Sequence, residues 1–280
     1  MRAGSVTDAA RVLNVTQPAV SAALKQLENR LKLQLFDRTG GRFRPTPEAK
    51  ALLPDIAEIF GRLSAVERYS QDLAGGTRGV LAIAATTPLC DGFVAKAVAT
   101  FLKSRPDVKV TLQSAASPVV LDRVINREVD LGIVYEPVVS RAARMDAIGK
   151  AAIVCVLPAR HRLAKRSALR LSDLEHERVI TYLPQALLRP YIDRALGMSS
   201  VPLQIAVETS TSATAIMLAV HGAGIALIES AFFAARPVAG FVMRPLEPRI
   251  ELKSLLLRPL RGSTPRVATD FLEHLAKAFA

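Results

Sequence analysis

The feature that most constrains this chain is a pair of short amphipathic helices joined by a tight turn, within residues 5–31. Ser5 can cap the first helix, and Asp8 three residues on completes a start that resembles a capping box. The apolar residues that follow recur at helical spacing and form one face, namely Val6, Ala9, Ala10 and Leu13. Asn14 and Val15 then separate the two helices. Two helices joined by so short a turn are typical of the helix-turn-helix motif.

The second helix carries different kinds of side chain on its two sides. Thr16 can cap it, and Pro18 is tolerated in its first turn. Its predicted buried stripe consists of Val20, Leu24, Leu27 and Leu31. The other side and its flank are small, polar or basic, which suits a helix that enters the major groove of DNA. The residues that we expect to contact DNA from this helix are Thr16, Gln17, Pro18, Ser21 and Lys25.

A basic hairpin is predicted directly after this pair of helices. Gly40 and Gly41 suit its tip, and Arg42 and Arg44 alternate around Phe43. Alternate residues of a strand share one face, so both arginines are expected on the same side of the hairpin. Such a wing can reach phosphates or the narrow minor groove, and we expect Arg42 and Arg44 to contact DNA.

Charge and cysteine content agree with a DNA-binding protein of a reducing compartment. The 280-residue chain has a formal net charge of +12, and its first 50 residues hold nine Lys or Arg against four Asp or Glu. Cys90 and Cys155 are its two cysteines, too few for a disulfide framework. No apolar run is long enough to span a membrane, and the polar N-terminus is unlike a signal peptide. We therefore expect a cytoplasmic protein with no membrane partner.

A long helix is predicted to follow the wing. Thr46, Pro47 and Glu48 supply a cap, a proline at the first helical position and an acid in the first turn. Its apolar residues follow a heptad-like spacing, namely Leu52, Ile56, Ile59, Leu63, Val66 and Leu73. A seam this narrow favours pairing with a second copy of the chain. The alternative is a helix that lies on its own globular domain. Residues 74–79 are rich in glycine and are predicted to form a hinge.

The rest of the chain has the alternating strands and helices of an α/β fold. The predicted strands are Val80–Ala85, Val108–Leu112, Asp130–Tyr135, Ile153–Leu157, Val179–Tyr182, Leu203–Val207, Gly224–Ile228 and Leu252–Leu257. The predicted fold is thus a winged helix-turn-helix (1–46), a linker helix and hinge (47–79), and an α/β region (80–280). That region divides into two Rossmann-like subdomains of the periplasmic-binding-protein type, subdomain I (80–157 plus 250–280) and subdomain II (158–249).

The motifs of the first 50 residues resemble those of the LysR-type transcriptional regulators. The matching segments are Gly4–Ala10, Val15–Ser21, Leu27-Glu28, Leu35–Arg38 and Arg44–Ala49, with looser matches at Asp130–Ile133 and His221–Leu227. Among them, Gly40–Arg42 and Pro45–Lys50 are similar to the branch that regulates opine and basic-amino-acid metabolism. The resemblance implies double-stranded DNA as a partner, a homodimer or tetramer, and a small effector bound between the two α/β subdomains.

The sequence departs from the family at its start. Family members usually carry about one more helix before the Gly4-Ser5 step, whereas Met1 lies three residues before Gly4. Either the true start lies upstream and Met1 is internal, or the product lacks part of its DNA-binding core. A misplaced start or a truncated product is favoured over a functional short form.

Short hydroxyl side chains follow several predicted strands, at the edge where α/β sheets bind ligands. These residues and one acid are the candidate effector site, namely Thr86, Thr87, Ser117, Thr209, Ser210 and Glu136. Hydroxyls and free N–H groups there can hold a carboxylate, and Glu136 can meet an ammonium or guanidinium group. The pattern suits an amino acid or an opine-like conjugate. The alternative is that each hydroxyl merely caps its helix.

No catalytic, metal or cofactor site is predicted. The four histidines are scattered, and none has a metal-ligand partner at i+3 or i+4. No phosphate-binding glycine loop occurs between a strand and a helix. An inert Cys90 thiol is favoured over a redox sensor. We therefore expect a ligand-responsive transcriptional regulator. The rivals are a small-molecule binding protein of the periplasmic type, disfavoured by the helix-turn-helix and the lack of a signal peptide, and an enzyme on a related fold.

Overall fold

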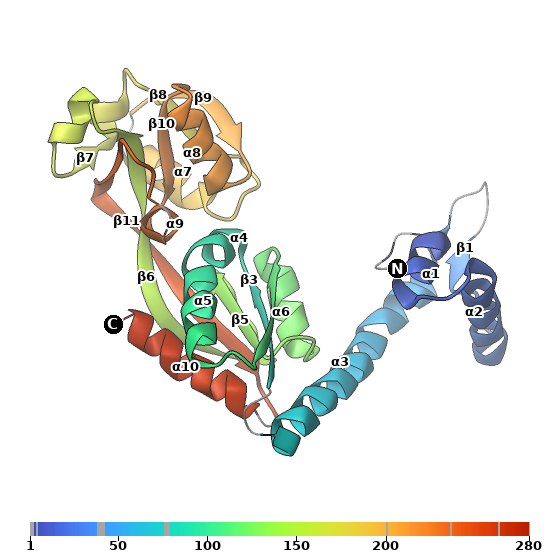
Figure 1. The fold of residues 1–280 in the computed structure, drawn as a ribbon. Coiled ribbons are helices and arrows are strands. Elements are labelled where there is room, and N and C mark those ends of the chain that lie inside the picture. The colour runs from blue at the N-terminus through green and yellow to red at the C-terminus, as the bar shows by residue number, and fades with distance from the viewer. Residues whose placement is uncertain are drawn as a thin grey trace. The chain divides into compact units, whose positions relative to one another are not determined.

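The computed structural model describes residues 3, 5–37, 43–75, 79–199, 201–235, 237–262 and 264–279. These residues form two compact units, one within residues 1–61 and the other within residues 62–280 (Figure 1). The predicted hairpin tip at Gly40-Gly41, residue Arg42, and residues 76–78 of the predicted hinge lie outside the described residues. The domain boundaries predicted above remain predictions.

The first unit begins with the two predicted helices, α1 (Val6–Leu13) and α2 (Gln17–Leu31). The Ser5 hydroxyl accepts a hydrogen bond from the Asp8 amide at 3.0 Å, which confirms the predicted cap. Asn14 ends α1 in the left-handed conformation (φ 53°), where asparagine is tolerated better than most residues. Thr16 occupies the N-cap position of α2, but its side chain makes no capping hydrogen bond, contrary to the prediction.

The predicted buried stripe of α2 is wrong in part. Val20 and Leu24 are half-buried, whereas Leu27 and Leu31 are 40% and 42% exposed. The core of this unit is small and consists of Leu35, Phe36 and Ala49, with Leu24, Phe43 and Leu52 packed against it. Helical spacing predicts which residues share a face, but burial also needs a partner surface, which this core offers only to part of the stripe.

Strands β1 (Phe36–Asp37) and β2 (Arg44–Pro45) pair antiparallel, with Asp37 opposite Arg44. They are followed by the predicted long helix, α3 (Pro47–Gly75). The Thr46 hydroxyl accepts a hydrogen bond from the Ala49 amide at 3.2 Å, which confirms the predicted helix start.

The second unit is built on one nine-stranded sheet that serves two subdomains (Figure 1). In subdomain I, β3 (Val80–Ala85) lies between two parallel neighbours, β4 (Lys109–Ser114) and β5 (Leu131–Tyr135). In subdomain II, β8 (Arg178–Tyr182) lies between β9 (Gln204–Thr209) and β10 (Ile225–Glu229), again in parallel. This arrangement confirms the predicted α/β fold class.

Two long antiparallel strands, β6 (Ala143–Pro158) and β11 (Phe241–Pro259), run through both subdomains. One part of β11 pairs with β5, and one part of β6 pairs with β10. The predicted strands Ile153–Leu157 and Leu252–Leu257 covered only part of each. The remaining residues of β6 and β11 are mostly polar or partly exposed, so no apolar run in the sequence indicates that they belong to strands.

Helices cover both faces of the subdomain I sheet. Successive residues of β3 point to opposite faces, so they pack against different helices. Leu81 and Ile83 belong to the core cluster that contains Phe101 of α5 (Ala95–Ser104) and Phe271 of α10 (Arg266–Phe279). Ala82 and Ala84 belong to a second cluster, with Val120 and Val124 of α6 (Ser117–Ile125). A Cβ at Gly132 would lie 2.7 Å from Val124, so only glycine lets α6 approach β5 so closely.

The remaining elements are short and mostly lie in subdomain II. They are α4 (Thr87–Leu89), η2 (Cys90–Val94), η3 (Arg162–Lys165), β7 (Leu169–Arg170), η4 (Leu171–Leu174), α7 (Arg189–Ser199), α8 (Ser212–Val220) and α9 (Ser230–Ala235). Gly222 and Gly224, in the turn between α8 and β10, have φ angles of 81° and 153°. A side chain at Gly224 would overlap the Arg178 carbonyl, so this position requires glycine.

Candidate functional site

The polar side of α2 is accessible to a large partner. Gln17, Pro18 and Lys25 are exposed, and Ser21 is half-buried. The Gln17 amide Nε2 donates to the Ser21 hydroxyl at 3.0 Å, which holds the two side chains together one turn apart. This pair leaves the Gln17 Oε1 atom available, and both groups match base edges in the major groove.

Glu28, on the same helix, fixes the start of the wing. Its Oε1 atom accepts hydrogen bonds from the backbone amides of Leu35 at 2.8 Å and Phe36 at 3.1 Å. The Leu27-Glu28 motif therefore positions β1 relative to α2.

The wing itself is held by aromatic stacking. The rings of Phe36 and Phe43 lie 4.3 Å apart at an interplanar angle of 15°. Arg44, the next residue, is exposed, as a group that contacts DNA must be. Arg42, its predicted companion, lies outside the described residues.

Two of the candidate effector residues follow β3. Thr86 occupies the N-cap position of α4 without a side-chain capping bond, and its Oγ1 atom is buried with no hydrogen-bond partner. The Thr87 hydroxyl lies 2.8 Å from the Ser114 hydroxyl at the end of β4.

Ser117 and Glu136 follow the next two strands of subdomain I. Ser117 is the first residue of α6 rather than its cap, and its buried hydroxyl also lacks a partner. The Glu136 carboxylate lies 3.8 Å from the Lys253 ammonium group, and its backbone carbonyl accepts a hydrogen bond from the Tyr191 hydroxyl of α7 at 2.6 Å.

Thr209 and Ser210 lie before α8 in subdomain II. Thr209 is buried at the end of β9, and Ser210 is exposed. Thr211, not one of the candidates, caps α8 by accepting a hydrogen bond from the Thr214 amide at 3.1 Å. Capping therefore does not engage the hydroxyls of Thr86 or Ser117, which weakens the view that these hydroxyls are there only as caps.

A buried acid that the sequence analysis missed lies in the same subdomain. Glu229, the last residue of β10, is fully buried and accepts hydrogen bonds from the hydroxyls of Tyr182 and Ser212. Burial raises the pKa of Glu229 to about 7, although both hydrogen bonds act in the opposite direction. Burial and the nearby Glu229 also raise the pKa of Tyr182 and of Tyr135. An acid directly after an apolar strand could have revealed Glu229.

Glu229 lies close to where the two subdomains meet. Figure 1 shows α9, which follows Glu229, beside α4 of subdomain I. A Cβ at Gly92 of η2 would lie 3.1 Å from the Phe232 backbone of α9, so the two segments are in direct contact. The ends of β3, β5 and β10 thus carry the unpaired Thr86 hydroxyl, the unpaired Tyr135 hydroxyl and the Glu229 carboxyl.

Both cysteine thiols, of Cys90 and Cys155, are free and buried. Burial raises the pKa of both Cys90 and Cys155, which opposes formation of a reactive thiolate. Among the described residues, no group of three or more His, Cys, Asp or Glu side chains could hold a metal ion. Nor is any described helix long and apolar enough to cross a membrane.

Two family models match the chain. Residues 1–50 match the bacterial regulatory helix-turn-helix protein model of the lysR family, and residues 74–280 match the LysR substrate binding domain.

Individual proteins are similar over nearly the whole chain. The regulatory protein NocR of Agrobacterium tumefaciens is 30% identical, covering 99% of this chain and 93% of NocR. The octopine catabolism/uptake operon regulatory protein OccR of Rhizobium meliloti is 31% identical, covering 97% and 91%. Among solved structures, CbnR, a LysR family transcriptional regulator, has a TM-score of 0.73 at 17% identity and covers 100% of this chain and 95% of that one. The matched proteins are regulators of transcription and not enzymes.

Proposed function

Because this chain belongs to the LysR family of bacterial transcriptional regulators, we propose that it contacts DNA through α2 and the wing. It responds, in this proposal, to a small effector held between its two α/β subdomains. The proposed site of action is the cytoplasm. The observation that carries the DNA-binding assignment is the accessible polar side of α2, where Gln17 and Lys25 are exposed. A small-molecule binding protein without a DNA function is not favoured, since it would need no such helix.

The first prediction separates base recognition from phosphate contact on α2. Gln17→Ala should change sequence preference, because the amide can pair with adenine. Lys25→Ala should weaken binding to all sequences and reduce the slope of log affinity against log salt by about one unit, if it contacts one phosphate. DNA-binding titrations over a range of salt concentrations measure both. If both variants bind as the unmodified chain does, the assignment of α2 is wrong.

The second prediction concerns the wing. Replacing Arg42 and Arg44 with alanine should remove much of the DNA affinity, because phosphate contacts provide a large part of binding. The fold should persist, since Arg44 is exposed and the Phe36–Phe43 stack is untouched. Circular dichroism checks the fold, and a binding titration measures the loss. Unchanged affinity would exclude a role for the wing.

We further propose that the effector is an amino acid or an opine-like conjugate bound by Thr86, Thr87, Ser117, Glu136, Thr209 and Ser210. Buried hydroxyls without a partner are rare in folded proteins, so those of Thr86 and Ser117 are suited to a ligand carboxylate. Glu136 makes only a loose ion pair with Lys253, which a cationic ligand group can replace. The name of OccR, with its reference to octopine, supports the same class of ligand.

The third prediction concerns the class of effector. A thermal-shift screen that compares amino acids and opines with aromatic and sugar acids tests it. A ligand at a hundred times its Kd should stabilise the chain by about 2.7 kcal/mol. We expect arginine-like or opine-like compounds to do so, and we expect Glu136→Gln to abolish the effect. Stabilisation by purely anionic compounds alone would contradict the assignment.

The proposed assembly is a homodimer that pairs through the apolar seam of α3. Two such dimers then form a tetramer in this proposal. Four residues of this seam are exposed in the single chain, namely Ile56, Ile59, Leu63 and Val66. Exposed apolar residues at heptad spacing favour a helical partner over solvent.

A further inference from the structure

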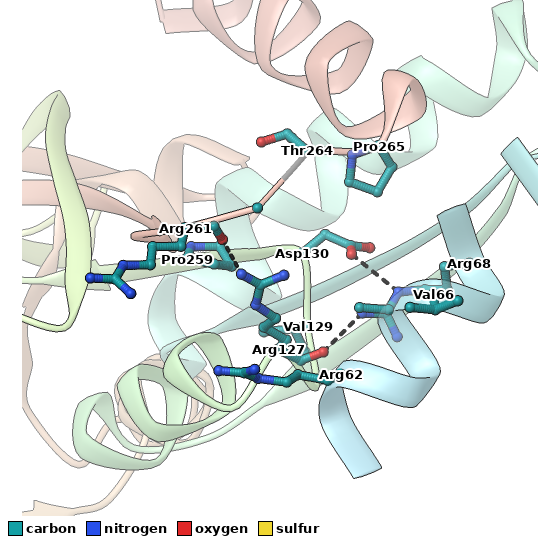
Figure 2. Close-up of a pocket in the computed structure, with 12 residues that line it drawn as sticks. Arg62, Val66, Arg68, Arg127, Val129, Asp130, Pro259, Arg261, Thr264 and Pro265 are labelled. Atoms are coloured by element: carbon teal, nitrogen blue, oxygen red, sulfur yellow. Dashed lines mark hydrogen bonds and ion pairs between the residues drawn. The ribbon is translucent and has the colours of Figure 1, made fainter. Parts of the chain in front are cut away.

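One carboxylate joins the two sides of the glycine-rich segment 74–79. Asp130, directly before β5, accepts from Arg68 Nε of α3 at 3.1 Å (Figure 2), and its other oxygen accepts from the Ala82 amide of β3 at 2.8 Å. Arg68 precedes the glycine-rich segment, Ala82 follows it, and all three residues belong to the second unit. We call these three residues the Asp130 clamp. The clamp spans the segment that was predicted from the sequence to be a hinge.

Further hydrogen bonds support the clamp on both sides. The Asp130 amide donates to the Ala82 carbonyl at 2.8 Å, so Asp130 is joined to β3 through its backbone as well as its side chain. Arg68 Nη2 also donates to the Arg127 carbonyl at 3.0 Å, as Figure 2 shows. Arg68 is therefore held at two points by the segment that leads from α6 into β5.

Both partners of the ion pair are buried. The side chains of Arg68 and Asp130 are 11% and 5% exposed. A buried ion pair adds little stability by itself, but removal of one partner leaves the other charge buried and less well compensated. Withdrawal of α3 from subdomain I would take Arg68 away from a carboxylate that stays buried. The pair therefore opposes any separation of the end of α3 from β3 and β5.

The last glycine of the segment serves close packing. A Cβ at Gly79 would lie 2.9 Å from the Val267 Cβ atom of α10, and Gly79 is buried. The Gly79 carbonyl accepts a hydrogen bond from the Lys109 amide at 3.0 Å. Hinge residues must be able to change φ and ψ by large amounts, whereas Gly79 is packed and hydrogen-bonded. This end of the glycine-rich segment is thus fixed on subdomain I.

We propose that the Asp130 clamp makes the end of α3 a fixed part of subdomain I, so that α3 does not turn about residues 74–79. Arg68 and Asp130 are then positioning residues for the helix that leads to the DNA-binding unit. The strands that the clamp joins, β3 and β5, end directly before Thr86 and Glu136 of the proposed effector site. A ligand there acts on the two strands that hold α3, and this last step rests on the proposed function.

Spin-label distance measurements on the full chain test the clamp without any ligand. The substitutions Glu67→Cys in α3 and Lys96→Cys in α5 provide label sites, because both residues are exposed. Labelled chains are diluted with an excess of unlabelled chains, so that distances within one chain are measured. Cys90 and Cys155 are buried, and a sample without the introduced cysteines measures their background. We expect a single narrow distance distribution.

The double variant Arg68→Gln/Asp130→Asn removes both charges together, so neither is left buried without the other. Asparagine can still accept from the Ala82 amide, so β3 and β5 should stay joined. We expect a broad distance distribution in place of the narrow one, with an unchanged circular dichroism spectrum. Arg105→Gln is the matched control. It removes an arginine that pairs with Asp270 of α10 at 2.7 Å, and it should keep the narrow distribution.

Three results would overturn the clamp: a broad distribution in the unmodified chain, a narrow one in the double variant, or an equal broadening by Arg105→Gln. Arg68→Gln alone leaves Asp130 and its hydrogen bond to Ala82 in place, so it gives the same test if the double variant does not fold. No ligand is present in these samples. A wrong effector assignment would therefore leave the result unchanged, and the two proposals can fail separately.

Discussion

Replacing Ile59 with lysine is expected to split the proposed dimer into monomers. Ile59 is 65% exposed in the single chain and lies in the middle of the α3 seam, between Ile56 and Leu63. In a self-paired helix, the substitution places a charged group from each chain into an apolar contact. Burial of an unpaired charge costs several kcal/mol, so the dimer dissociation constant should rise on the order of a thousandfold.

Sedimentation velocity measures this change directly. Ala51→Lys is the matched control, because Ala51 is exposed on the same helix and lies outside the seam. It adds the same charge and should leave the dimer intact. If the Ile59→Lys variant sediments like the unmodified chain, α3 does not pair through this seam.

The sequence predicted well those elements whose signal is local. Ser5 and Thr46 cap their helices as predicted, because a hydroxyl followed by helix-forming residues needs only nearby backbone amides. The uniformly apolar segment Val80–Ala85 is a strand buried on both faces, as parallel strands usually are.

Elements that depend on distant partners were predicted less well. Strand β11 is far longer than its apolar part, because pairing with β6 extends it over polar residues. Leu27 and Leu31 have the right spacing for a buried stripe, but the small core beside them leaves both exposed. Spacing identifies a face of a helix, whereas tertiary contacts decide whether that face is covered.

The candidate effector site shows the same limit. Ordinary rules for α/β sheets pointed to Thr86 and Ser117, whose hydroxyls are buried without partners. The same rules did not single out Glu229, although it also ends a strand. Only the fold shows that this acid is fully buried and hydrogen-bonded to Tyr182 and Ser212.

Replacing Glu229 with glutamine is expected to change the free energy of unfolding more favourably at pH 8 than at pH 5, in comparison with the unmodified chain at the same pH. The folded chain raises the pKa of Glu229 from 4.5 to about 7, chiefly by burial. Between these values the unfolded chain releases a proton that the folded chain keeps. Stability therefore falls as pH rises through this window, by roughly 3 kcal/mol in total.

Glutamine has nearly the same shape, accepts a hydrogen bond from Tyr182 and does not titrate. The advantage of the Glu229→Gln variant in the free energy of unfolding should therefore grow by roughly 2.5 kcal/mol between pH 5 and pH 8. Urea unfolding of both proteins at the two pH values measures it. Glu175→Gln, at an exposed position, is the control for the loss of one carboxylate.

Whether the stability difference changes between pH 5 and pH 8 distinguishes two roles for this acid. If Glu229 is held neutral by burial, as its surroundings indicate, the variant gains on the unmodified chain as pH rises. If Glu229 were instead stabilised as a carboxylate by the hydroxyls of Tyr182 and Ser212, it would be ionised in both the folded and the unfolded chain from pH 5 to pH 8, and the difference between the two proteins would stay nearly constant over this range. A constant difference, or a change equal to that of Glu175→Gln, would show that Glu229 does not hold its proton near neutral pH. The hydroxyls of Tyr182 and Ser212 would then outweigh the cost of burying its charge.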